Sequence, residues 1–223
     1  MASAPIPADY PPMRFAADRA DLRARRIVEA AYDLLDESGL EALTIRAVLA
    51  RTGLARRAFY ENFTGKDDLM LAVFEQTIRL AALHYRQMTE AQPSPMTRLA
   101  MIVTSIALAT ADVDSAAEDL TGAHRRSAAM SREHLRLAES RPAELQAALA
   151  PLRALIAEQL QAGIAAGEMR AGDADLQASL IYNLVSTTAH TELLADEGET
   201  PDRERRIRLA AEVWEFCRRA IAV

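Results

Sequence analysis

The chain has 223 residues, of which half are hydrophobic and 26% are charged. This balance is sufficient for a hydrophobic core and excludes a disordered, highly charged chain. Cys217 is the only cysteine and has no internal disulfide partner, and no apolar run approaches the 18 residues of a membrane span. No apolar leader segment follows the first residue, so we expect a globular cytoplasmic protein.

The net charge of -6 is unevenly distributed along the chain. Residues 1–66 carry 10 basic and 9 acidic side chains, whereas residues 67–223 carry 16 and 23. The acidic excess therefore belongs to the C-terminal part and does not exclude nucleic-acid binding by the N-terminal part. Lys66 is the only lysine among 26 basic residues.

Residues 1–20 contain four prolines, which remove amide donors and disfavour a helix, so we expect an extended N-terminal arm. From residue 21 the apolar side chains recur at helical spacing until Gly39, which predicts the first helix. A second, short helix is predicted between the N-cap residue Thr44 and Gly53. A third follows over about 55–63.

A fourth helix is predicted from Lys66 to about Met88, before Pro93 and Pro95 interrupt the pattern. Beyond it, helical spacing covers about 97–111, becomes less regular to about 139, and resumes over 142–166. Two more helices are predicted, one around 176–185 and the last from Pro201. Because no strand pattern appears, we predict an all-α fold of about nine helices.

The segment 43–69 combines a short helix, a glycine-containing turn and a second short helix with basic and aromatic side chains. This pattern is typical of a helix-turn-helix, which places its second helix in the major groove of DNA. Arg56 and Arg57 stand at the start of that helix, from which arginines reach guanine edges. The hydroxyls of Thr44 and Tyr60 and the ammonium of Lys66 are candidates for phosphate contacts. Considered alone, Arg56 and Arg57 could belong to a solvated helix face, and Tyr60 could be a core aromatic residue.

Residues 23–75 resemble the DNA-binding domain of the TetR family. The resemblance rests on the order and spacing of Thr44, Gly53-Leu54, Phe59-Tyr60, Phe63 and Lys66-Asp67-Asp68-Leu69. It implies an N-terminal three-helix DNA-binding domain (21–66) and a helical ligand-binding and dimerisation domain (67–223). In this family the last two helices form a four-helix bundle between two subunits. The resemblance adds two DNA-binding candidates, Arg46 and Asn62, although Arg46 could equally be a surface residue.

Two residues depart from the family pattern. Leu49 occupies a position where the family usually has a small alanine, which predicts a different crossing of the second and third helices. Ala55 replaces the usual serine or threonine cap, which is expected to cost about 1 kcal/mol in the recognition helix. The docking angle and the operator sequence therefore do not follow from the sequence.

The resemblance also implies a mostly apolar pocket for a small molecule in the C-terminal part. Its candidate lining residues are Met101, His124, Tyr182 and His190, because polar groups in such pockets orient the ligand. Each of the four could instead be an ordinary core or surface residue. The histidines show no i, i+4 pairing and no catalytic or phosphate-binding motif occurs, so we expect no metal site, no cofactor and no enzyme activity.

We therefore predict a ligand-responsive transcriptional repressor that binds a palindromic operator as a homodimer and is released by a small lipophilic molecule. An activator would use the same residues, so the sequence does not separate activation from repression. The alternative is a helical small-molecule enzyme or sequestering protein in which the helix-turn-helix is incidental.

Overall fold

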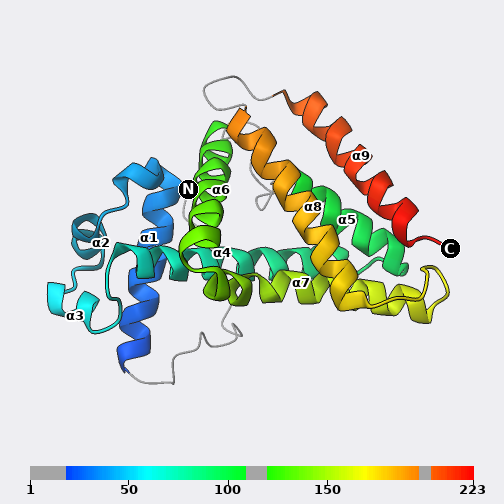
Figure 1. Ribbon diagram of the computed structural model, residues 1–223. Coiled ribbons are helices and arrows are strands. Elements are labelled where there is room, and N and C mark those ends of the chain that lie inside the picture. The colour runs from blue at the N-terminus through cyan, green and yellow to red at the C-terminus, as the bar shows by residue number, and fades with distance from the viewer. Residues whose placement is uncertain (1–18, 109–119, 196–201) are drawn as a thin grey trace.

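The computed structural model describes residues 19–108, 120–195 and 202–223, and these residues form an all-α fold (Figure 1). Within the described ranges there are nine helices and no strand, apart from an isolated bridge between Met169 and Ala222. The helices are α1 (Arg19–Ala42), α2 (Ile45–Thr52), α3 (Arg56–Tyr60), α4 (Lys66–Thr89), α5 (Pro95–Ala107), α6 (Leu120–Ser140), α7 (Pro142–Ala165), α8 (Ala174–Ala195) and α9 (Arg203–Ile221).

A first hydrophobic core lies among α1, α2, α3 and the first half of α4. Helix α1 contributes the side chains that its helical spacing predicts, and α3 contributes Phe59, which is fully buried. The principal buried side chains of this core are Ile27, Ala31, Leu35, Leu43, Val48, Phe59, Phe63, Leu69 and Val73. The three N-terminal helices thus share one core, which fixes α3 against α1 and α4.

A second, larger core lies among the remaining helices. Helix α7 supplies many of its residues, because its apolar side chains cover much of its circumference and it packs against α4, α5 and α8. Central side chains of this core are Leu99, Ile102, Leu145, Leu149, Leu152, Leu155, Ile156, Leu160 and Val185.

Helices α4 and α6 belong to both cores. On α4, Leu69 and Val73 pack in the first core, whereas Phe74 and Tyr85 pack in the second. On α6, Ala129 packs in the first core and Met130 lies against both. These two helices are therefore the structural connection between the helix-turn-helix and the rest of the chain (Figure 1).

The C-terminal helix is tied to the second part of the fold at both ends. Near its start, Arg206 donates a hydrogen bond from Nη2 to the carbonyl of Leu108 at 3.0 Å. At its end, the amide of Arg170 donates to the carbonyl of Ile221 at 2.8 Å, next to the Met169–Ala222 bridge. Along its length α9 packs on α5.

Several boundaries differ from the sequence-based prediction. The segment expected to be irregular before residue 139 contains the continuous helix α6, whose polar residues interrupt the apolar spacing while Ala128, Ala129 and Leu137 are buried. Helix α3 is shorter than expected, and α9 begins at Arg203 because the side chain of Asp202 caps it, accepting from the amide of Arg205 at 2.9 Å.

Residues 1–18, which make up most of the expected N-terminal arm, lie outside the described residues. The last two residues of that segment, Arg19 and Ala20, already belong to α1. None of the helices among the described residues combines the length and the apolar character that a membrane crossing needs.

Candidate nucleic-acid interface

The turn between α2 and α3 is fixed by local hydrogen bonds. Thr44 caps α2, as its residue type predicts, because its hydroxyl accepts the amide of Ala47 at 3.1 Å. Gly53 ends the helix in the left-handed region with φ of 67°, and its amide donates to the carbonyl of Leu49 at 2.9 Å. That backbone conformation favours glycine over residues with a side chain. The Thr52 hydroxyl donates to the carbonyl of Val48 at 2.9 Å.

Helix α1 supports this turn from outside. Arg26 donates from Nη2 to the carbonyl of Thr52 at 2.9 Å, and Arg51 forms an ion pair with Glu37 at 2.5 Å. The first contact joins residues that are 26 positions apart in the sequence, and the second joins residues that are 14 positions apart. Both contacts hold α2 and the turn against α1. The orientation of α3 is thereby set by two helices as well as by the core beneath it.

Helix α3 has a buried and an exposed face. Ala58 and Phe59 are buried, and the Phe59 ring packs against that of Phe63 with centroids 5.5 Å apart. Arg56 and Tyr60 lie on the exposed face, one helical turn apart, with the guanidinium 5.5 Å from the ring centroid and Nη2 donating to the Tyr60 hydroxyl at 3.3 Å. A cation over an aromatic face is electrostatically favourable and restricts both side chains. The two side chains thus support each other on the exposed face.

Arg57 is open to solvent, with 90% of its side chain exposed. Its Nε pairs with Oε1 of Glu61 at 2.9 Å, and Oε2 of Glu61 pairs with Arg23 of α1 at 3.3 Å. Sequence reasoning did not identify Glu61 or Arg23 as functional. The i, i+4 spacing of Arg57 and Glu61 was a usable signal for the first pair, whereas the contact with α1 depends on the fold.

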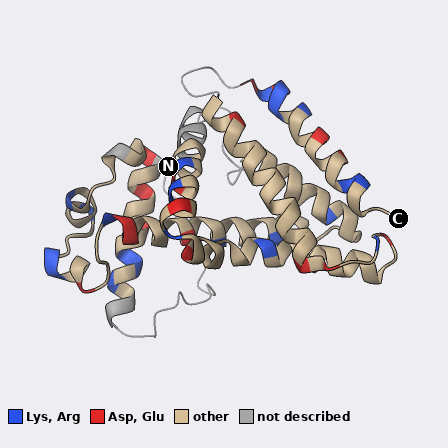
Figure 2. Ribbon diagram, in the orientation of Figure 1, with Lys and Arg blue, Asp and Glu red and all other residues tan. Residues whose placement is uncertain are grey.

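Thr44, Arg46 and Lys66 are also exposed or half-exposed. Arg46 and Lys66 form no ion pair with any residue that the structure describes, so their charges are not neutralised locally. Basic segments mark α2 and the start of α3 at the end of the molecule distant from α9 (Figure 2). This end presents uncompensated cations beside exposed hydroxyl groups, which is the chemistry of phosphate binding.

Asn62 differs from the other predicted DNA contacts. Its side-chain amide nitrogen donates to the carbonyl of Ala58 at 2.8 Å, and the residue is half-buried. This bond satisfies a carbonyl at the C-terminal end of α3, where intrahelical donors are lacking. The structure thus gives Asn62 a local role in ending the recognition helix.

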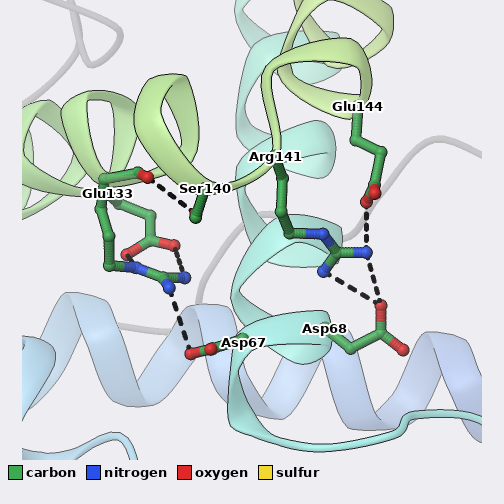
Figure 3. A network of polar contacts seen from close by, with 7 residues as sticks. Asp67, Asp68, Glu133, Ser140, Arg141 and Glu144 are labelled. Atoms are coloured by element: carbon green, nitrogen blue, oxygen red, sulfur yellow. Dashed lines mark hydrogen bonds and ion pairs between the residues drawn. The ribbon is translucent and has the colours of Figure 1, made fainter.

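The start of α4 carries a polar network that the sequence did not indicate. Asp67 and Asp68 pair with Arg136 and Arg141, which come from α6 and from the turn before α7 (Figure 3). The pairs join residues about 70 positions apart, for example 73 positions for Asp68 and Arg141, so no local pattern reveals them. The ion pair with the buried Glu133 raises the pKa of Arg136.

The predicted ligand-binding residues are distributed over three helices. Met101 is half-buried on α5, whereas Tyr182 is buried in the second core on α8, where burial raises the pKa of its hydroxyl. His190 lies further along α8. His124 belongs to α6, but its side chain is outside the described residues.

His190 meets a histidine that the sequence did not pair with it. Its ring centroid lies 4.6 Å from that of His134 on α6, and the His134 ring packs on Phe74 of α4. Burial, together with the neighbouring His134, lowers the pKa of His190 to about 4. Burial also lowers the pKa of His134. Among the described residues, no three histidine, cysteine or acidic side chains converge as a metal site.

Helices α8 and α9 each expose large apolar side chains, and we call these residues together the α8–α9 face. On α8 the stripe consists of Leu176, Leu180 and Leu184, at intervals of four residues and with 57%, 61% and 38% of each exposed. On α9 the exposed apolar residues are Ile207 and Phe216, the latter 67% exposed. Phe216 borders an open hollow that is also lined by Ala211, Glu212, Glu215 and Arg219. Large apolar side chains that stay exposed on successive turns of a helix are candidates for an interface with another protein.

Comparison with known proteins gives a consistent result for the N-terminal segment. Residues 27–73 match the family described as bacterial regulatory proteins, tetR family. An HTH-type transcriptional regulator of Staphylococcus aureus is 27% identical over 66 residues, which is 30% of this chain. The chain spans about a third of the length of the curated relatives it matches, 36% in this case.

Solved structures of the same fold cover nearly the whole chain. The transcriptional regulator FadR from Bacillus subtilis, in complex with stearoyl-CoA, has a TM-score of 0.62 at 18% identity and covers 86% of this chain and 96% of its own. A TetR-family transcriptional regulator from Agrobacterium tumefaciens has a TM-score of 0.55, also at 18% identity, and covers 92% of this chain and 100% of its own. Both are described as transcriptional regulators, and at this identity the likeness extends to the fold alone.

Proposed function

We propose that this chain, whose residues 27–73 match the tetR family of bacterial regulatory proteins, is a ligand-responsive transcriptional repressor. The observation that carries the proposal is the exposed face of α3. There Arg56, Arg57 and Tyr60 stand out from a recognition helix whose opposite face is buried.

Two kinds of DNA contact are proposed. Arg56 and Arg57 reach base edges in the major groove, where arginine binds guanine, and so supply sequence preference. Thr44, Tyr60, Arg46 and Lys66 contact the phosphate backbone and so supply affinity and register. Lys66 supports this division. Its positive charge lies in the first turn of α4, where the helix dipole disfavours a cation, so a bound phosphate would stabilise it. Asn62 is retained as a proposed contact through its remaining carboxamide oxygen.

We propose that two copies pair through the last two helices. The α8–α9 face supports this, because covering its leucines and Phe216 with the same face of a second copy would remove apolar surface from water. A two-fold pair sets its two recognition helices about 34–36 Å apart, which matches successive major grooves. The operator is then a palindrome.

We propose that the effector is a small lipophilic molecule bound between helices of the second part, near Met101, His124, Tyr182 and His190. The stearoyl-CoA bound by the Bacillus subtilis protein carries a long acyl chain, which supports an effector with a lipophilic part. The effector binds more tightly to a form of the dimer in which the two α3 helices have a different spacing. It thereby lowers the fraction of dimers that fit DNA, and the ratio of its affinities for the two forms sets the size of this decrease.

The test is selection of fragmented genomic DNA from the source organism by the purified protein, followed by sequencing of what is retained. The expected result is enrichment of fragments that share a palindrome, including DNA upstream of the protein's own gene. An Arg57→Ala variant should retain a broader set of fragments, because a base contact is lost while phosphate contacts remain.

The same experiment distinguishes the competing hypothesis. A dimer that retains no fragment in the absence of ligand would contradict DNA binding and favour a helical enzyme or sequestering protein. A reporter placed behind a retained fragment separates the two regulatory modes, since a repressor lowers expression and an activator raises it.

A further inference from the structure

Asp68 divides its carboxylate between two parts of the molecule. Its Oδ2 accepts the backbone amide of Thr64 at 3.1 Å and faces the Thr64 hydroxyl at 3.4 Å. Its Oδ1 accepts from Nη1 and Nη2 of Arg141, at 3.3 Å each (Figure 3). One side chain therefore joins the turn before α4 to the turn between α6 and α7.

The turn that Asp68 holds has little other side-chain support. Gly65 stands at the N-cap of α4 and has no side chain with which to cap the helix. Asp68, at the third helical position, instead reaches back to the amide of Thr64, one residue before the N-cap. Between the buried Phe63 and Leu69, the segment Thr64-Gly65-Lys66 is thus oriented chiefly by the Asp68 carboxylate.

Arg141 is itself held in place. Its amide donates to the carbonyl of Leu137 at 2.8 Å and its carbonyl accepts the amide of Leu145 at 3.0 Å, so its backbone joins α6 to α7. Its guanidinium also pairs with Glu144. The side chains of Asp68 and Arg141 are only 28% and 27% exposed, so solvent screens this pair less than an open surface pair.

We propose that Arg141 is a positioning residue for DNA binding, acting through Asp68 to orient the Thr64–Lys66 turn toward a phosphate. Lys66 is exposed and long, and a side chain that contacts a phosphate must lose conformational freedom. A turn that is already ordered lowers that loss. The inference rests on the proposed function, because it concerns a residue that contacts DNA under that proposal.

The test compares Arg141→Ala with a matched control, Arg86→Ala. Arg86 pairs with Glu158 at 2.8 Å and thereby also joins α4 to α7, but near the opposite end of α4. Arg141→Ala is expected to weaken operator binding by about threefold to tenfold, whereas Arg86→Ala leaves it unchanged. Arg141→Lys, which keeps the charge, is expected to restore part of the affinity.

Two readouts separate positioning from a general effect on stability. Hydrogen exchange at the Thr64 amide should accelerate in Arg141→Ala and not in Arg86→Ala, without DNA present. In a Lys66→Ala background, Arg141→Ala should cause no further loss of DNA affinity, because two residues that act through one contact are not additive.

An Arg141→Ala variant that binds DNA like the wild type, or that loses as much affinity in the Lys66→Ala background, would overturn the inference and leave the proposed function intact. Unchanged Thr64 exchange in Arg141→Ala would overturn it as well. A wild-type protein that retains no DNA would instead overturn the proposed function, and with it the DNA-binding role of Arg141.

Discussion

At the scale of single residues, Lys66 stands out because it is exposed in the first turn of α4 and forms no ion pair with the described residues. If it binds a phosphate, Lys66→Ala should weaken binding to all DNA sequences alike. The slope of log affinity against log salt should fall by about 1, because one fewer counterion is released. Fluorescence anisotropy over a range of salt concentrations measures both quantities.

Arg170→Ala is a suitable control, since Arg170 is exposed in the turn before α8 and its removal changes the net charge equally. This control should leave the salt slope unchanged. An equal slope in the wild type and in Lys66→Ala would contradict the phosphate contact.

The paired histidines predict a dependence of stability on pH. The pKa of His190 is about 4 in the folded protein, below the ordinary histidine value of 6.5, so the unfolded chain binds the proton more readily. The stabilising contribution is therefore complete above pH 6.5 and is lost as the pH falls from about 6.5 to about 4. Between pH 7 and pH 5 the loss should be about 2 kcal/mol for this residue.

Urea unfolding at a series of pH values checks this expectation. In a His190→Phe variant the decrease between pH 7 and pH 5 should be smaller than in the wild type, although His134 still contributes. An identical pH dependence in the two proteins would show that His190 is not held neutral by burial and by His134.

Residue types in the sequence predicted the roles of residues that act locally, but not of residues that contact a distant helix. Thr44 and Gly53 were predictable as the cap and the end of α2, because one hydroxyl and one left-handed backbone position fulfil these roles locally. Asn62 is half-buried, the other predicted DNA contacts are exposed, and the contacts of all of them with DNA remain predictions. Arg141 and the His134–His190 pair could not be found, because each contact joins side chains from separate helices.

At the scale of elements, the recognition helix is short and lacks a capping side chain. Ala55 occupies the N-cap with extended backbone angles and makes no side-chain hydrogen bond, as the departure from the family pattern predicts. Ala55→Ser should supply that bond and stabilise the domain by about 1 kcal/mol. The midpoint of thermal or urea unfolding measures the gain.

Ala50→Ser provides the matched control, because Ala50 is exposed inside α2, where a serine cannot cap and is a slightly poorer helix former. The capping account predicts a higher midpoint for Ala55→Ser than for Ala50→Ser. Equal midpoints would contradict it.

The α8–α9 face makes a prediction about assembly. Leu180→Glu places a charge in the middle of the exposed leucine stripe of α8 and should convert the proposed dimer into monomers, because burying an unpaired carboxylate is costly. Sedimentation of the variant measures its mass. Leu135→Glu, at a leucine that is 47% exposed on α6, should leave the dimer intact.

A Leu180→Glu protein that sediments as a dimer would contradict pairing through this face. If the variant is monomeric and retains the helical content of the wild type, a loss of palindrome binding follows from the loss of the second recognition helix.

Helix boundaries show where sequence periodicity succeeds. Helix α4 follows the prediction closely, because proline residues lie just beyond its end and its apolar spacing is regular. The sequence indicated only a less regular helical stretch where α6 lies, because its apolar side chains are few and those that are buried divide between two cores. A helix that packs in two cores buries side chains on more than one face, so its apolar residues show only a weak helical period in the sequence.

At the scale of the whole molecule, two hydrophobic cores share α4 and α6. The Asp67–Arg136 and Asp68–Arg141 pairs join the first turn of α4 to α6 and to the residue before α7. The all-α class, the helix count and the N-terminal helix-turn-helix were predictable from spacing and turn residues. The division at residue 66 remains a prediction, and the arrangement of the later helices depends on long-range packing that spacing alone does not determine.

The central claim is that two copies of this chain read a palindrome through paired α3 helices. Hydroxyl-radical footprinting on a retained genomic fragment tests it most directly. The account predicts two protected regions related by the palindrome, with centres about 10 base pairs or a multiple of one helical turn apart. A single protected region, or no protection at protein concentrations that saturate retention, would contradict it.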